Sequence, residues 1–135
     1  MNLNRLETLS SIAAPSGYED EIIKYIRQEM LRFVQDVKTD RLGNLISFLP
    51  GSQSGQSKPV MIFAHMDELG FIVRKIEEGG FIRLERLGGV PERTAPSRPV
   101  IITGARGPVQ GVIGHKSHHF TQPDEKYVVI RVHDL

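Results

Sequence analysis

The sequence predicts an α/β protein whose second half consists mainly of short strands. Three observations lead to this prediction. Apolar residues recur at helical spacing up to residue 34, an apolar run at residues 60–64 has the pattern of one buried strand, and short apolar runs alternate with glycine-rich turns after residue 70. The pattern changes near residue 70, so we expect two structural parts.

Two helices are expected in the first part. The first helix would carry an apolar residue at every third position: Leu3, Leu6, Leu9 and Ile12. This spacing predicts a short helix that ends before Pro15. Ser16 and Glu19 have the spacing of a capping box, in which a hydroxyl and a carboxylate satisfy N–H groups at a helix start. The apolar face that follows predicts a second helix over residues 17–34.

Strands are expected after these helices. Residues 36–39 and 45–49 flank a turn-rich stretch, and we expect them to pair as a hairpin. The polar residues 51–57 predict an exposed loop. Residues 60–64 are apolar on both faces, as expected of a central strand that is covered on each side. Together with the helices, these strands predict a layered α/β domain.

The part after residue 70 has the pattern of an all-β module. Short apolar runs separated by turns predict strands at residues 71–73, 81–84, 99–103, 109–113 and 127–132. Arg83, Glu85 and Arg86 predict a solvated strand face with cross-strand ion pairs. No helical repeat of useful length follows residue 70.

The composition is that of a folded globular protein. The chain has 135 residues, 39% hydrophobic and 24% charged. Seventeen basic and sixteen acidic residues leave a net charge of +1, which favours neither nucleic acid nor an anionic membrane as partner. The first residues lack a signal-peptide core, and no apolar run approaches the roughly 20 residues that span a bilayer. A cytoplasmic location is therefore expected.

A metal site in this chain would use nitrogen and oxygen ligands, because the sequence has no cysteine. His65 follows the expected buried strand, and Asp67 lies two residues beyond it. Side chains at the carboxyl ends of strands in α/β sheets commonly face a ligand crevice. An imidazole suits zinc or cobalt, and a nearby carboxylate can accept the second ring N–H and set the tautomer. The pair is thus a candidate metal ligand with an orienting carboxylate.

These residues also have plainer interpretations. A lone His-x-Asp is more often a local hydrogen-bonded turn, since one His and one Asp fall short of a zinc shell. Glu68 is expected to be solvated. His118 and His119 would point to opposite faces of a strand, which favours a structural or interface role over chelation of one ion.

A series of segments supports the metal interpretation. In order they are Ala-Pro-Ser-Gly-Tyr-Glu at 14–19, Asp-x-Leu-Gly-Asn at 40–44, Ala-His-Met-Asp-Glu-Leu-Gly-Phe-Ile-Val at 64–73, Gly-Gly at 88–89, Gly-Val-Ile-Gly at 111–114 and Lys-Ser-His-His at 116–119. The series spans nearly the whole chain and resembles the M42 family of metallopeptidases, whose members include proteins called glutamyl aminopeptidase, deblocking aminopeptidase or endoglucanase. The segments around His65 and at 111–114 are its most specific parts.

The resemblance implies a fold and an assembly. Family members have a layered αβα catalytic domain interrupted by an inserted, barrel-like, β-rich dimerisation domain. On this pattern, residues 1–69 are the amino-terminal part of the catalytic α/β domain, and residues 70–135 are an incomplete β-rich dimerisation domain. The resemblance also implies homo-oligomers built through the β-rich module.

The resemblance further implies a reaction. Family members remove amino-terminal residues from peptides with a metal-activated water, two divalent ions (zinc or cobalt before others) and a Glu as general base. His65 matches the first metal ligand of the family. Asp67 matches a carboxylate that steers this histidine and the catalytic water, and it is the predicted catalytic residue of the chain. The other ligands and the base come later in the family's sequences, so we expect the chain to be inactive alone, with the missing ligands on a longer product or a complementary chain.

Two other function classes stay open. The chain could be a non-catalytic, β-rich interaction module with a vestigial metal motif. A small barrel that binds nucleic acid is poorly supported, because aromatic residues make up 7% of the chain and form no basic-aromatic platform. If the buried strand is left uncovered, the chain is expected to associate through it or to need the missing segments.

Overall fold

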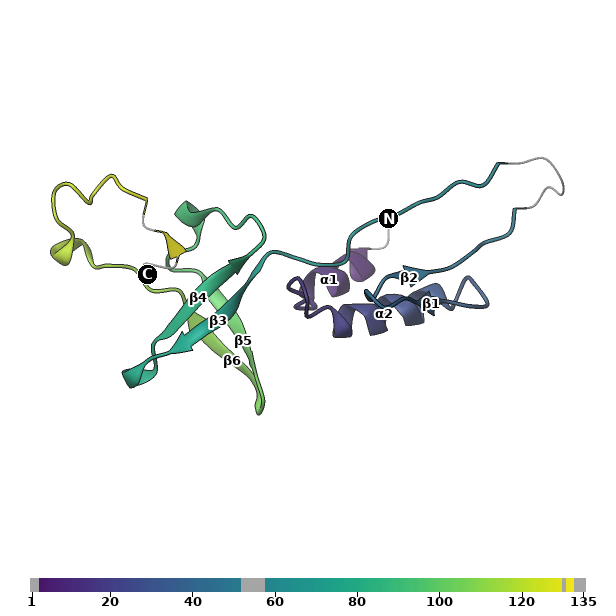
Figure 1. Cartoon of the computed structure of the whole chain (residues 1–135), viewed down its shortest axis with the longest axis horizontal. Helices are drawn as coiled ribbons and strands as arrows, with labels where there is room; N and C mark the ends of the chain where they lie inside the picture. The colour runs from purple at the N-terminus through teal and green to yellow at the C-terminus, as the bar shows by residue number, and fades with distance from the viewer. Residues whose placement is uncertain (1–2, 52–57, 130, 133–135) are drawn as a thin grey trace. The chain divides into compact units, whose positions relative to one another are not determined.

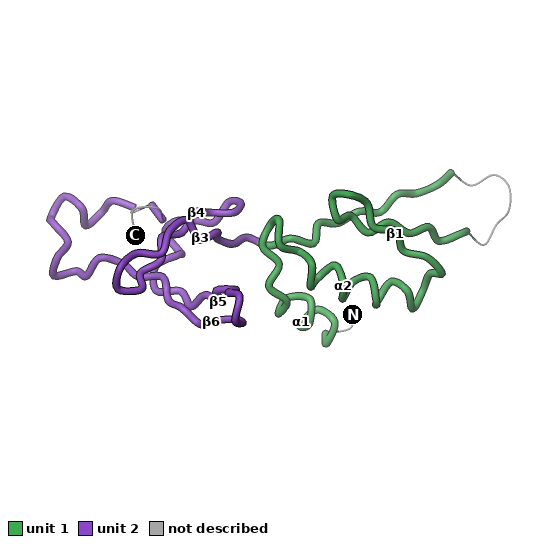
Figure 2. Tube along the Cα trace, turned by 60° about the horizontal axis from the view of Figure 1, so that its bottom comes forward, with its two compact units in different colours: residues 1–68 green, residues 69–135 purple. Residues whose placement is uncertain are grey.

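The computed structural model describes residues 3–51, 58–129 and 131–132. The chain divides into two compact units, Met1–Glu68 and Leu69–Leu135, which Figure 2 shows in different colours. In the part of the chain that is described, the two α-helices belong to the first unit and the longer strands to the second (Figure 1). The chain is therefore of the α/β class, with small sheets. Residues 52–57 of the expected polar loop lie outside the described residues.

Helix α1 (Leu3–Ser11) confirms the prediction from the leucine spacing. It is joined to the next helix by an ion pair, in which Arg5 Nε lies 3.0 Å from Glu29 Oε2. The Arg5 guanidinium also lies 5.6 Å from the centroid of the Phe33 ring, a cation–π distance. These contacts hold the two helices of the first unit together at one end.

Helix α2 (Asp20–Met30) is shorter than the predicted helix over residues 17–34. Gly17 has a φ of +88°, so the chain makes a turn here before the helix begins. The capping-box prediction is wrong. The Ser16 hydroxyl donates to the carboxylate of Asp67, and Glu19 accepts the N–H of Gly17 at 2.8 Å. An ionised acceptor forms a stronger hydrogen bond than a neutral one, so Asp67 takes the hydroxyl that would have capped the helix.

A small hairpin of β1 (Lys38–Thr39) and β2 (Leu45–Ile46) confirms the predicted pairing of these segments, with two residues in each antiparallel strand. The Asp40 carboxylate closes the connecting turn. It accepts hydrogen bonds from the backbone N–H groups of Leu42 and Asn44, both at 2.9 Å, and from the Asn44 side chain at 2.8 Å. Such Asx-type turns satisfy backbone donors that a two-residue strand leaves unpaired.

This turn makes the first unit sensitive to acid. The hydrogen bonds from Asn44 hold the pKa of Asp40 below its ordinary value of 3.8. Arg83, in the second unit, likewise lowers the pKa of Glu77 below 4.5. Because these carboxylates bind protons less readily when folded, they stabilise the fold above their ordinary pKa values, and this contribution is lost as the pH falls through the folded values.

We therefore expect the urea midpoint of unfolding, followed by circular dichroism, to fall between pH 7 and pH about 3. Asp40→Asn should lower the midpoint at pH 7 and change it less in acid, since the amide has no proton to gain. Asp124→Asn is the control, because the described residues give the Asp124 carboxylate no comparable set of hydrogen bonds. Equal acid sensitivity of the wild type and Asp40→Asn would contradict this role of Asp40.

The central strand expected at residues 60–64 is not formed. Residues 58–67 belong to no strand, and the side chains of residues 60–63 are 83–91% exposed. Figure 1 shows this segment as an extended trace that leads to β3. A strand is stabilised mainly by its neighbours, and no described segment of the first unit pairs with this one. The apolar pattern of a central strand is present, but the layers that would cover it are not among the described residues.

The second unit contains two antiparallel hairpins. Strand β3 (Gly70–Ile76) pairs with β4 (Ile82–Leu87), and β5 (Pro99–Gly104) pairs with β6 (Gly107–Val112). These confirm four of the five predicted strands. The fifth, at 127–132, is wrong within the described residues, where residues 123–128 form turns and a bend.

Ala95, Ile113 and Val132 form the buried core of the second unit, with three half-buried side chains packed against it: Phe71, Leu84 and Val100. The described strands form separate two-stranded sheets and no closed barrel. The barrel-like layout thus stays a prediction.

Arg83 and Arg86 of the predicted strand face form ion pairs, but their partners do not lie on a neighbouring strand. Arg83 Nε lies 3.2 Å from Glu77 Oε1, across the β3–β4 hairpin. Arg86 pairs at 3.3 Å with Glu92, which lies in a short 3-10 turn, η2 (Glu92–Thr94), and not on the neighbouring strand. Both ion pairs are partly exposed, so each contributes little to stability.

Candidate metal-ligand site

Hydrogen bonds attach residues 65–68 to residues 14–16, although the apolar run before them belongs to no strand. Glu68 forms a parallel bridge with Pro15, and its N–H donates to the carbonyl of Ala14 at 2.9 Å. The N–H of Ala14 donates in return to Glu68 Oε1 at 3.0 Å. Ala14 is 1% exposed, so this N–H needs a partner inside the protein. The expectation that Glu68 is merely solvated is therefore wrong: its carboxylate fastens the segment to residues 14–16.

The Asp67 side chain uses both of its oxygens. Oδ2 accepts a hydrogen bond from the hydroxyl of Ser16, which lies about fifty residues earlier in the chain. Oδ1 lies 3.2 Å from His65 Nδ1. The hydrogen bond from Ser16, and secondly the nearby His65, lower the pKa of Asp67 below its ordinary value of 3.8. Asp67 is therefore an ionised acceptor at neutral pH.

The surroundings of His65 determine its tautomer. Nδ1 lies 3.0 Å from the backbone carbonyl oxygen of Asp67, in addition to its contact with Oδ1. A carbonyl oxygen and a carboxylate can only accept hydrogen bonds, so Nδ1 must carry the proton. The lone pair of a neutral ring is then on Nε2. The side chain is 85% exposed, and a neutral imidazole with its second nitrogen held in this way is the usual form of a metal-binding histidine.

Among the described residues, no further ligands gather around His65. The described residues contain no group of three or more His, Asp or Glu side chains that could hold a metal ion. Asp40 is engaged in its turn. His118 and His119 lie in a 3-10 turn, η3 (His118–Phe120), and not on a strand as expected. Their rings are 6.0 Å apart at 63°, an edge-to-face contact.

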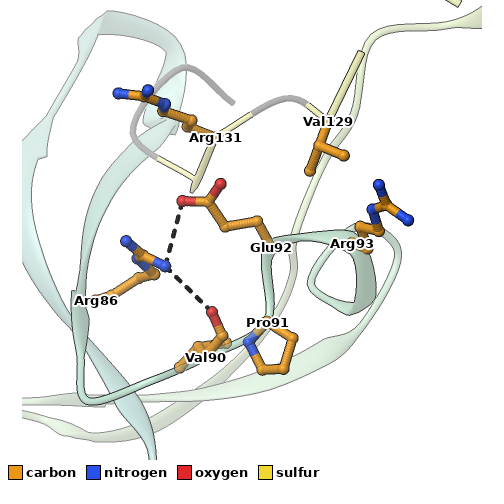
Figure 3. Close-up of a pocket in the computed structure, with 7 residues that line it drawn as sticks. All are labelled: Arg86, Val90, Pro91, Glu92, Arg93, Val129 and Arg131. Atoms are coloured by element: carbon orange, nitrogen blue, oxygen red, sulfur yellow. Dashed lines mark hydrogen bonds and ion pairs between the residues drawn. The ribbon is translucent and has the colours of Figure 1, made fainter. Parts of the chain in front are cut away.

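The second unit has a separate, positively charged cavity of about 500 Å³. Figure 3 shows the residues that line it: Arg86, Val90, Pro91, Glu92, Arg93, Val129 and Arg131. The Arg86 guanidinium donates to the carbonyl of Val90 at 3.3 Å and pairs with Glu92 at 3.3 Å. Three arginines against one glutamate would suit an anionic group. The described lining residues include no histidine, hydroxyl or thiol.

Comparison with known proteins relates this chain to aminopeptidases. SgcX of Escherichia coli (strain K12), described as an aminopeptidase candidate, is 44% identical over 129 residues, which are 93% of this chain and 34% of SgcX. The aminopeptidase APDkam598 from the archaeon Desulfurococcus kamchatkensis has a matching structure with a TM-score of 0.84 and 34% identity, over 97% of this chain and 35% of that one.

A third relative forms large assemblies. The TET1 peptidase of Pyrococcus horikoshii, which can assemble into a tetrahedron or a large octahedral shell, matches with a TM-score of 0.79 and 32% identity, over 98% of this chain and 38% of that one. The chain thus spans about a third of the length of these relatives.

The pattern of the M42 glutamyl aminopeptidase family matches residues 43–135. The chain belongs to this family of hydrolases, as its motif series indicates. Among the residues that the structure describes, no helix is long and apolar enough to cross a membrane.

Ser16 is the residue of this site that sequence reasoning missed. Its spacing to Glu19 suggested a helix cap, whereas its hydroxyl bonds to Asp67. The available signal was the Pro-Ser-Gly segment, because it is part of the motif series that includes the His65 segment. A contact across about fifty residues cannot be inferred from local spacing.

Proposed function

We propose that this chain is the amino-terminal part of a metal-dependent aminopeptidase and that it supplies His65 as one metal ligand. The carrying observation is the pair of contacts that keeps the proton on Nδ1 of His65 and leaves the lone pair on Nε2. Membership of the M42 family supports the proposal. The imidazole fits a divalent ion of borderline softness, of which zinc and cobalt are the preferred candidates.

Asp67 acts through His65 in this proposal. One of its carboxylate oxygens accepts from Ser16 and the other faces His65, which supports the role of a residue that orients the ligand. When bound, two divalent ions would supply a water of lowered pKa and would stabilise charge on the peptide carbonyl. The general base and the other ligands belong to later segments of the family, and the amino-terminal residue of a peptide is the proposed substrate.

The domain roles are part of the same proposal. Residues 1–69 would contribute to the catalytic α/β domain, and residues 70–135 to a barrel-like dimerisation domain through which copies of the chain form homo-oligomers. The related TET1 peptidase, which assembles into large shells, supports oligomer formation. We propose a cytoplasmic location for the assembled enzyme.

A non-catalytic interaction module is the second candidate. The exposed apolar run at residues 60–63 favours it, because such a run is a ready interface for another chain. In this case the contacts of His65 would be vestigial, and its replacement would change neither metal affinity nor activity in any assembly.

Zinc binding by His65 tests the main proposal. We expect His65→Ala to weaken the binding of zinc to the purified chain at least about tenfold in calorimetric titrations. His115→Ala is the matched control, because His115 also has an exposed ring whose Nδ1 lies near a backbone carbonyl, that of Lys116 at 2.9 Å. Equal zinc affinity of the wild type and His65→Ala would reject the ligand role.

A further inference from the structure

Among the described side chains, only Ser16 donates a hydrogen bond to Oδ2 of Asp67. Asp67 is otherwise partly open to water, with a side chain 39% exposed. A carboxylate on the surface can rotate about its terminal torsion, which is broad and roughly two-fold. A donor on Oδ2 removes this freedom and leaves Oδ1 directed at Nδ1 of His65. The hydrogen bond from Ser16 therefore determines which way the carboxylate faces.

Ser16 is itself held by the backbone around it. Ala14 and Glu68 exchange hydrogen bonds at 2.9 and 3.0 Å, so residues 14–16 run beside residues 66–68. The N–H of Tyr18 donates to the carbonyl of Pro15 at 2.8 Å and closes a turn over Ser16. Gly17, at φ +88°, permits that turn. The hydroxyl is thus presented from a built turn and not from a free loop.

We propose that Ser16 is a positioning residue of the M42 site: it fixes the Asp67 carboxylate and, through it, the Nδ1–H tautomer of His65. This inference rests on the proposed function, since the tautomer matters for catalysis only if Nε2 of His65 binds a metal ion. The chain of contacts runs from Ser16 Oγ–H to Asp67 Oδ2, and from Asp67 Oδ1 to His65 Nδ1. Second partners of this kind set the tautomer and orientation of a ligand.

The backbone carbonyl of Asp67 also accepts from Nδ1, so loss of Ser16 would weaken the tautomer preference without abolishing it. A single hydrogen bond of typical strength corresponds to a change of about 2–10-fold in an equilibrium. We expect Ser16→Ala to lower the ratio of Nδ1–H to Nε2–H tautomers of His65 by about this factor. A purely structural role of Ser16 in starting α2 would leave the ratio unchanged.

The ring ¹⁵N shifts of His65 measure this ratio directly in the metal-free 135-residue chain with ¹⁵N-labelled histidine. The chain has five histidines, and the His65→Ala variant assigns the signal. Ser16→Thr keeps the hydroxyl and should restore the wild-type ratio. Ser47→Ala is the matched control, because the Ser47 hydroxyl is also half-buried in the first unit and donates to a backbone carbonyl, that of Asp36, at 2.8 Å. If Ser16→Ala does not fold, Ser16→Cys, which has only a weak donor, replaces it.

A wild-type ring that is mainly Nε2–H, or a ratio that Ser16→Ala or Ser16→Cys leaves unchanged, would overturn the positioning role. In a second experiment, zinc is added and the ¹⁵N shift of Nε2 of His65 is followed. Ser16→Ala should weaken zinc binding about 3–10-fold relative to Ser47→Ala. If zinc does not shift Nε2 in the wild type, the proposed ligand role fails, while the tautomer ratio still decides the role of Ser16. The two hypotheses therefore fail by different measurements.

Discussion

The 135-residue chain alone is expected to hydrolyse aminoacyl substrates no faster than the uncatalysed background. The chain spans about a third of the length of its relatives, and the family resemblance puts the general base and most ligands in later segments. A missing general base by itself lowers a rate by about 10²–10⁴-fold. Release of p-nitroaniline from leucyl, lysyl and glutamyl anilides, with zinc or cobalt added, measures the residual rate.

Activity should appear when the chain is produced together with the later part of a relative such as SgcX, which is 44% identical over the matched residues. In that assembly His65→Ala is expected to lower the rate at least about 100-fold, because even residues that only orient a ligand contribute 10–100-fold. His115→Ala should leave the rate unchanged. Clear metal-dependent turnover by the chain alone would contradict the proposal. An active assembly in which His65→Ala keeps its full rate would favour the interaction module.

The apolar run at residues 60–63 is expected to make the isolated chain self-associate. Its four side chains, Val60, Met61, Ile62 and Phe63, are 83–91% exposed. Burial of such a side chain stabilises an interface by about 1.5–3 kcal/mol, and an extended segment with unpaired backbone groups offers hydrogen bonds as well. Sedimentation velocity over a concentration series should show a mass that rises with concentration.

Ile62→Asp tests whether this run is responsible. We expect the variant to sediment as a monomer over the same concentration range, because a charge in the middle of an apolar interface is costly to desolvate. Leu42→Asp is the matched control, since Leu42 is also highly exposed, at 87%, but stands alone in a turn. A wild-type chain that is a monodisperse monomer at all concentrations would refute the prediction.

The Ile62→Asp variant also distinguishes two roles of the run: self-association of the chain, and pairing with later segments of the same α/β domain. If the run is the central strand of an α/β domain, the later part of a relative should cover it and suppress self-association of the wild type. Ile62→Asp should then fail to form the active assembly, whereas Leu42→Asp should form it. Association that persists in the active assembly would instead point to a surface for other copies of the chain.

Local patterns predicted the elements whose stabilising contacts are near in sequence. The leucine spacing of α1 and the turn-flanked apolar runs of β3 to β6 correspond to a helix and two hairpins in which each strand pairs with the next. The contacts of His65 with Asp67, two residues on, were also within reach of the sequence. In each case the partners are supplied within a few residues, so the local pattern carries the information.

Contacts between distant segments decided the rest. The apolar run at residues 60–64 has the composition of a central strand, but pairing depends on neighbours that no described part of the first unit supplies. Ser16 had the spacing of a helix cap, but its hydroxyl bonds to the stronger, ionised acceptor Asp67 about fifty residues away. The sequence by itself determined the α/β class, the M42 family and the proximity of His65 and Asp67. Only the tertiary structure decided that Ser16 holds Asp67 and that Ala14 holds the neighbouring Glu68, because hydrogen bonds across such separations arise when the chain folds.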